Sequence, residues 1–190
     1  ICSVYDSGET PEGELWYTMP FIAGESLRDR LDSEPRLPIS TAVRIAREAA
    51  QGLEAAHWSA IGYALILSGE LDRAEPILRR AMRLDSFNLT VLSNMALVLA
   101  EKGSTQEAAR LSDQMRVRMP YDHEVMAQQV WFHARAGDAE LARAMLDTLQ
   151  LRMQRNGTSD VPLVIAFAGT GDTLRARAAL QRSVDRRDYG

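Results

Sequence analysis

A glycine and an alanine return together at a fixed interval, and this repeat constrains the fold of the chain more than any other feature. Successive pairs lie 34 residues apart, and in each pair the alanine follows the glycine by five residues. The pairs are Gly69 with Ala74, Gly103 with Ala108, Gly137 with Ala142, and Gly171 with Ala176. A fixed period of this length indicates stacked copies of one small structural unit.

The local sequence around each pair predicts a helix, a turn and a second helix. Each glycine follows an apolar stretch with helical spacing, such as the stretch that ends at Leu67 before Gly69. Because glycine adopts positive φ without steric cost, it favours the end of a helix. Each alanine then falls in the first turn of a second helix, where a small side chain lets two helices approach closely. The sequence therefore predicts four helix pairs.

The repeats carry further shared positions. The first repeat has the fullest set: Trp58, Gly62, Leu65, Gly69, Ala74, Leu78 and Ala81. The second retains Ala96, Leu99, Gly103, Ala108 and Pro120. With the 34-residue period, these positions resemble the tetratricopeptide repeat (TPR) over residues 55–190. The resemblance implies a mainly α fold, a right-handed superhelical solenoid of about four helix pairs, with repeats near 55–88, 89–122, 123–156 and 157–190.

The resemblance also implies a binding surface. The ninth residue of each repeat points into the concave groove of a TPR solenoid, and here those residues are apolar or aromatic: Tyr63, Leu97, Trp131 and Ile165. Asn94 and Arg135 are the candidates for remnants of the polar clamp with which the family holds a partner's terminal carboxylate. A protein or peptide ligand in this groove, and a role as an interaction scaffold, are therefore expected. The alternative is that Trp131 and its neighbours pack between helices.

The first part of the chain does not follow the period. Residues 1–5 predict a strand that enters a turn at 6–8, and residues 15–19 predict a second strand, so we expect a β-hairpin. A short helix is predicted to end near Leu31. A long helix with Ser40 as its N-cap is predicted next, and it continues without a proline into the first repeat.

The same segment resembles the middle of a bacterial serine/threonine protein kinase domain. The resemblance rests on the strand and turn of residues 4–8, the strand and hinge of 15–22, the segment 24–31 and the helix 46–57. It implies a partial kinase-like domain over residues 1–57 followed by a TPR domain over 58–190, as in bacterial signalling proteins. Met19, Pro20 and Ile22 would be the remnant of the hinge that contacts adenine in the family.

The catalytic motifs of the kinase family are not found in the chain. The family's H-R-D loop follows an Ala-His pair closely, but here Trp58 comes directly after His57, and no D-F-G motif occurs later. Because those motifs supply the base and the metal ligand for phosphoryl transfer, we expect this chain to have no kinase activity and to need no cofactor. The alternative is phosphoryl transfer, with ATP, by an intact parent protein.

Composition restricts the partners and the compartment. A net charge of −4 argues against a surface for nucleic acid or anionic membranes. Cys2 is the only cysteine, so no internal disulfide can form, and no apolar run approaches the roughly 18 residues of a membrane span. We therefore expect a cytoplasmic protein. His123 and His133 lack the spacing of zinc ligands on a helix, and no metal site is predicted.

Overall fold

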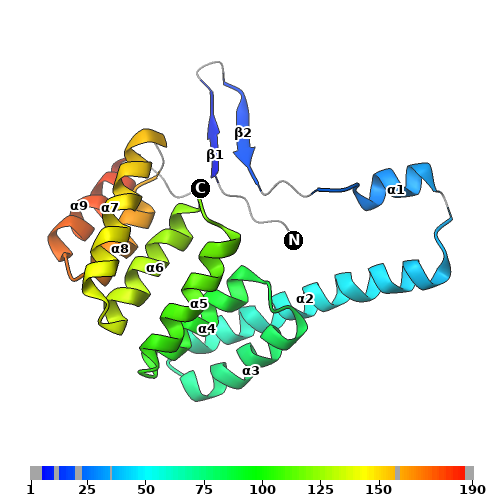
Figure 1. Ribbon diagram of the computed structural model, residues 1–190, viewed down its shortest axis with the longest axis horizontal. Helices are drawn as coiled ribbons and strands as arrows, with labels where there is room; N and C mark the ends of the chain where they lie inside the picture. The colour runs from blue at the N-terminus through cyan, green and yellow to red at the C-terminus, as the bar shows by residue number, and fades with distance from the viewer. Residues whose placement is uncertain (1–5, 11–12, 20–22, 35, 157–158, 187–190) are drawn as a thin grey trace. The chain divides into compact units, whose positions relative to one another are not determined.

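The computed structural model describes residues 6–10, 13–19, 23–34, 36–156 and 159–186, and within these ranges the chain forms two strands and nine helices (Figure 1). The elements are β1 (Asp6–Glu9), β2 (Leu15–Thr18), α1 (Leu27–Ser33), α2 (Ile39–Leu67), α3 (Leu71–Leu84), α4 (Leu89–Glu101), α5 (Thr105–Arg118), α6 (His123–Ala136), α7 (Ala139–Asn156), α8 (Val161–Gly169) and α9 (Thr173–Arg186). The chain divides into two compact units, residues 1–54 and 55–190.

The first unit contains an antiparallel hairpin, in which Asp6 pairs with Thr18 and Glu9 with Leu15. The predicted hairpin is present, but the turn predicted at residues 6–8 is wrong, because those residues belong to β1. The reversal comes later, where the Thr10 amide donates to the Glu14 carbonyl at 2.8 Å. The strand predicted at residues 1–5 lies outside the described residues.

The two helices that begin in the first unit start differently. Ser26 caps α1, and its hydroxyl and the Asp29 carboxylate form a reciprocal capping box. The prediction that Ser40 caps α2 is wrong. The helix already begins at Ile39, and the Pro38 carbonyl accepts a hydrogen bond from the Ala42 amide. α2 continues as one helix to Leu67, which confirms the predicted passage through the first repeat.

Residues 55–190 form a solenoid of stacked helix pairs, and the repeated glycines end its first helices. φ is positive at each of them: Gly69 (75°), Gly103 (88°), Gly137 (91°) and Gly171 (78°). The residue after each glycine donates its amide to a carbonyl five residues back, as Ser104 does to Leu99 at 2.8 Å. These bonds satisfy carbonyl groups that the end of a helix leaves free. The period therefore sets where α2, α4, α6 and α8 stop.

The repeated alanines lie in the core of this second unit. Ala74, Ala108 and Ala142 have no exposed surface, and Ala176 is partly buried. A glycine makes the close contact between the two helices of the first repeat. A Cβ added to Gly62 of α2 would lie 2.5 Å from a methyl carbon of Leu78 of α3. Leu78 of α3 therefore packs directly on the backbone of Gly62, and a larger residue at this position of α2 would require the Leu78 side chain to shift.

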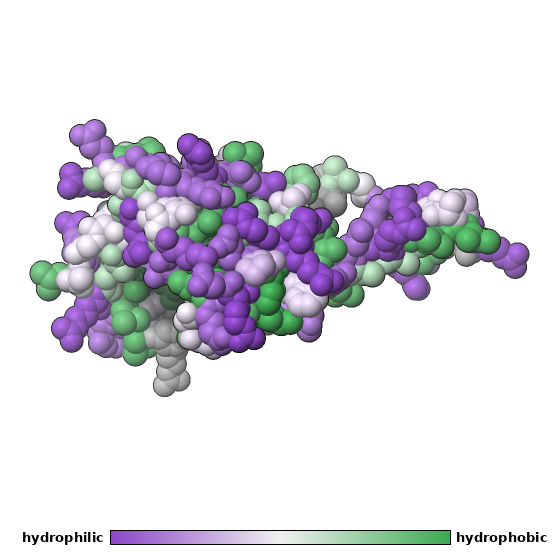
Figure 2. Space-filling view, turned by 90° about the horizontal axis from the view of Figure 1, so that it is seen from below, coloured by the Kyte–Doolittle hydropathy of each residue, from purple (hydrophilic) through white to green (hydrophobic). Residues whose placement is uncertain are grey.

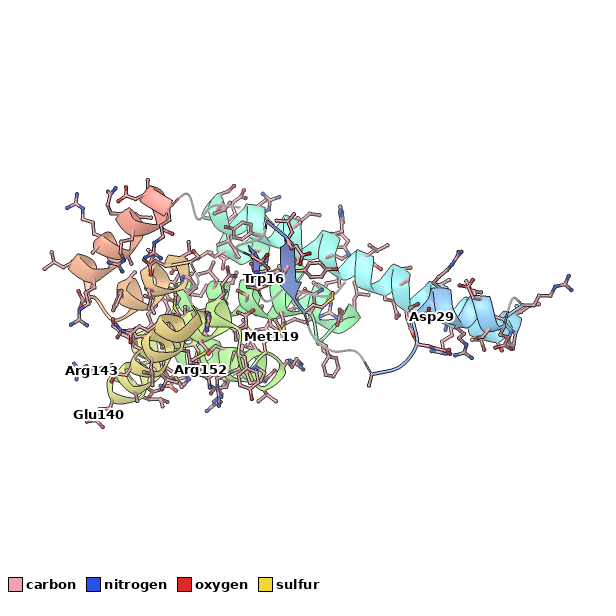
Figure 3. All side chains as sticks on the ribbon, turned by 90° about the horizontal axis from the view of Figure 1, so that it is seen from above. Trp16, Asp29, Met119, Glu140, Arg143 and Arg152 are labelled. Carbon is pink, nitrogen blue, oxygen red and sulfur yellow. The ribbon has the colours of Figure 1, made fainter. Side chains whose placement is uncertain are left out.

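A repeated contact of another kind joins neighbouring repeats. The Arg118 guanidinium lies 4.4 Å from the centre of the Phe87 ring, and Arg152 lies 5.3 Å from the centre of the Tyr121 ring. Arg152, labelled on α7 in Figure 3, also donates to the Pro120 carbonyl at 3.1 Å. In both cases an arginine near the end of a second helix covers the aromatic residue that precedes the repeat's first helix.

The stacking changes at the last repeat. α6 packs extensively on α5, whereas α8 packs on α6 and makes few contacts with α7. α8 also begins at Val161, although the period would start it near residue 157. Pro162 explains the late start, because proline fits the first turn of a helix but disrupts its interior. α7 is correspondingly longer than α5, with 18 residues against 14.

Candidate functional site

Trp131 lies on α6 in a setting that fixes its ring. The Arg135 guanidinium lies 4.7 Å from the centre of the indole ring, and Arg135 also forms an ion pair of 3.5 Å with Glu101 of α4. Gly169 of α8 also lies against this residue, since a Cβ added to Gly169 would lie 2.6 Å from the Trp131 Cα and 2.8 Å from Cδ1 of its ring. Trp131 is partly buried, so part of the residue remains exposed to solvent.

The sequence showed the aromatic residue and the arginine but not their neighbours. Glu101, Arg135 and Gly169 follow one another at 34-residue intervals, so they occupy the same position of successive repeats. Opposite charges at one position of adjacent repeats are a readable signal for an ion pair between first helices. The close approach of α8 at Gly169 has no comparable signal, because any small residue is common at a helix end.

The other apolar residues of the predicted groove differ in exposure. Tyr63 of α2 is 46% exposed, whereas Leu97 of α4 and Ile165 of α8 are partly buried. Ile165 packs against the core cluster formed by α6, α7, α8 and α9. The two interpretations of the sequence therefore apply to different residues: Tyr63 is open to solvent, and Ile165 contributes to packing.

Asn94 lies between helices. Its side chain is 9% exposed, and its amide nitrogen donates to the Ser59 hydroxyl at 3.0 Å. Ser93 makes a similar contact across the next interface, where its hydroxyl donates to the Gln128 amide oxygen at 2.8 Å. The Asn94 amide is thus used to join α4 to α2, and it is not offered to a ligand. Of the two clamp candidates, Arg135 is the exposed one.

The predicted hinge residues give no binding site among the described residues. Met19 is exposed just after β2, and Pro20 and Ile22 lie outside the described residues. Trp16, which is labelled on β2 in Figure 3, and its neighbour Tyr17 are also exposed. The kinase resemblance of residues 1–57 remains a prediction from sequence.

His133 is the centre of a polar cluster that the sequence did not suggest. Its Nδ1 lies 3.0 Å from the Asp138 carboxylate and its Nε2 lies 3.1 Å from the Asp113 carboxylate. Gln129 of α6 also donates to Asp113 of α5. The buried ring thus connects α5, α6 and the start of α7. This is a structural role. Asp138 is only five residues from His133, but Asp113 lies 20 residues away on another helix, and the spacing alone does not bring the three together.

Two searches over the described residues complete the survey of sites. No group of three or more histidine, cysteine, aspartate or glutamate side chains is placed to hold a metal ion. Within the same residues, no helix combines the length and the apolar character that crossing a membrane requires. Figure 2 shows the surface as a mixture of hydrophilic and hydrophobic residues.

Comparison with known proteins adds little to this description. No protein-family model matches the chain, and no curated protein matches its sequence. The chain is similar to the crystal structure of a tetratricopeptide repeat protein from Parabacteroides merdae ATCC 43184, with 17% identity and a TM-score of 0.49. The match covers 86% of this chain and 58% of that one, so the chain spans little more than half of its length. The likeness is too weak to bear on fold or function, which rest on the helices and contacts described above.

Proposed function

We propose that residues 55–190 bind a segment of a partner protein along the face formed by the first helices of the repeats, with Trp131 as the main contact. The observation that carries the proposal is the setting of Trp131, whose ring contacts Arg135 and Gly169 while the residue keeps part of its surface exposed. Tryptophan and arginine are the residues most often found where binding energy is concentrated.

The fixed ring favours binding for an entropic reason. A side chain that is already held in one orientation loses little freedom when a partner covers it, so less of the contact energy is spent on ordering. The ion pair from Arg135 to Glu101 holds the guanidinium over the ring from the side of α4. The two charges also offer polar groups beside the aromatic surface, as the rim of an interface does.

Neighbouring apolar residues extend the proposed surface along α4 and α2. Leu97 is partly buried, Tyr63 is 46% exposed, and Leu67 is exposed near the end of α2. An extended peptide or an amphipathic helix with apolar residues at regular spacing fits such a row. Ile165 and Asn94 are left out of the proposed contact, because the first packs on the core and the second is bonded to Ser59.

A display experiment tests the proposal. A random peptide library is selected on the purified chain, and the affinities of the enriched peptides are measured for the parent chain, for Trp131→Ala and for Val117→Ala. Val117 is an exposed apolar residue of α5, a second helix, and serves as the matched control. We expect Trp131→Ala to lower affinity by about thirtyfold, as the loss of a hot spot of about 2 kcal/mol does, and Val117→Ala to change it little.

Two outcomes of this experiment would contradict the proposal. Peptides that bind Trp131→Ala as well as the parent chain, or whose binding depends on Val117, would place the binding surface elsewhere. Phosphoryl transfer is not proposed as a second function, because no observation on the described residues favours it.

A further inference from the structure

A pocket of about 340 Å³ lies between α7, α8 and α9, at the irregular end of the solenoid. Its apolar lining includes Met153 of α7 and Leu163 and Phe167 of α8, which belong to the core cluster of this part of the chain. Small-molecule sites commonly have volumes of about 300–1,000 Å³, so this pocket has the size for a small ligand.

The pocket follows from the way in which α8 departs from the repeat. Because Pro162 delays its start, α8 lacks the first turn that α4 and α6 have. The longer α7 therefore extends past the point where a first turn of α8 would pack against it. At the other end of α8, Gly169 lets the helix lie against Trp131 of α6. α8 therefore packs on α6 instead of α7, and the space between α7 and α8 is the pocket.

Charged groups gather at this pocket. Asp160 occupies the N-cap position of α8 but makes no capping hydrogen bond. Its Oδ2 accepts from Nε of Arg182 at 2.7 Å, and Nη1 of Arg186 lies 3.9 Å from the same oxygen. Both arginines belong to α9 and line the pocket with Asp160. Two guanidinium groups thus meet one carboxylate, which leaves one positive charge in excess.

The arginines also have donors to spare. A guanidinium carries five N–H groups, and the contact with Asp160 uses one from Arg182, while Arg186 lies beyond hydrogen-bond distance. Both side chains are about half exposed, so a ligand can reach them. The planar fork of a guanidinium matches a carboxylate in a two-bond arrangement.

We propose that this pocket binds a small carboxylic acid with an apolar body. The carboxylate would bind Arg182 and Arg186, and the body would lie on Met153, Leu163 and Phe167. A monoanion balances the excess charge of the pocket. A dianionic phosphate would instead leave a negative charge close to Asp160, where repulsion opposes it.

Calorimetric titration of the whole chain with four small probes tests the ligand class. The probes are N-acetyl-L-phenylalanine, its neutral amide, 3-phenylpropanoate and phenyl phosphate. We expect at least one of the two carboxylic acids to bind about tenfold more tightly than the amide, because only the acids can accept charge-assisted hydrogen bonds. Preference for the acetylated amino acid would indicate the C-terminus of a peptide, and preference for phenylpropanoate a free acid. Tighter binding of phenyl phosphate than of both acids would overturn the proposal.

Two variants of α9 test whether the acid binds in this pocket. Arg186→Gln should weaken acid binding about tenfold without affecting the amide, whereas Arg177→Gln, an exposed residue of the same helix outside the pocket, should change neither. Arg186 is preferred to Arg182 because removal of Arg182 would take away the guanidinium that donates to the buried Asp160 at 2.7 Å. Tyr63→Ala changes the proposed peptide surface on α2, which does not line the pocket, and it should leave acid binding intact, so failure here is distinguishable from failure of the proposed peptide surface. Equal affinities for acid and amide, or an unchanged affinity in Arg186→Gln, would contradict the proposal.

Discussion

The two units of the chain both contain helices but differ in what those helices bury. In the first unit, none of the side chains whose burial the structure describes is buried, and large apolar residues such as Leu15, Ile39 and Leu53 are exposed. In the second unit, Leu78, Val91 and Val98 have no exposed surface. The difference shows that helical periodicity alone does not produce a core. A core appears where the 34-residue period brings a second helix onto the first.

Replacement of one leucine by alanine in each unit gives the largest expected contrast. Leu78 of α3 is fully buried, whereas Leu53 of α2 is 64% exposed. We expect Leu78→Ala to lower the free energy of unfolding by about 2–5 kcal/mol, because it removes apolar contacts and leaves a cavity. Leu53→Ala should change it by less than about 0.5 kcal/mol. Urea denaturation followed by circular dichroism measures both, and equal losses would remove the contrast between the units.

A smaller effect is expected where α2 meets α3. Gly62→Ala adds a Cβ that would lie 2.5 Å from Leu78, so overpacking should cost about 1–3 kcal/mol. Alanine in place of glycine inside a helix gains about 1 kcal/mol, so the net loss should be about 1 kcal/mol. In a Leu78→Ala background the steric cost disappears, and Gly62→Ala should then stabilise the chain. A double-mutant cycle measures this reversal of sign, and simple additivity would show that the two residues do not touch.

The smallest effect concerns the charge of Glu124 in the first turn of α6. Partial burial of its carboxyl group, and then the nearby Asp122 charge, raise the pKa of Glu124 above its usual value. A raised pKa in the folded state means that this group's stabilisation is present at low pH and is lost as the pH rises through that pKa. Glu124→Gln should therefore raise stability at neutral pH by at most about 0.5 kcal/mol, since the group keeps contact with solvent.

The pH series supplies its own control. Near pH 3 the carboxyl group is protonated in both the folded and unfolded states, so the difference between Glu124→Gln and the parent chain should vanish there. A difference that is the same at pH 3 and pH 7 would show that the substitution acts through packing and not through charge.

Much of the second unit could be predicted because the signals were local and repeated. The four glycines fixed the helix ends, and the alanines Ala74, Ala108 and Ala142 are buried as expected. The pairs of Arg118 with Phe87 and Arg152 with Tyr121 follow the same period and could have been found from it.

Other features depend on contacts that spacing does not show. The Asp160 side chain accepts a hydrogen bond from Arg182 of α9 and does not cap α8. The pocket lies where α8 makes few contacts with α7. Asn94 was assigned to the groove by its place in the repeat, but the hydrogen bond to Ser59 decides where its side chain lies. In the first unit the pattern predicted a hairpin but misplaced β1, since short polar strands and turns have similar compositions.

Native-state hydrogen exchange tests most directly the central claim, which is that the cooperative core begins at Ala55 and lies within residues 55–190. The account predicts that amides of α4 and α6 exchange only through global unfolding, with protection equal to the free energy of unfolding. Amides of β1, β2 and α1 should exchange with little protection, because a two-stranded hairpin is marginal in water and α1 has no buried residues. Protection of the hairpin and α1 equal to that of α4 would contradict the account.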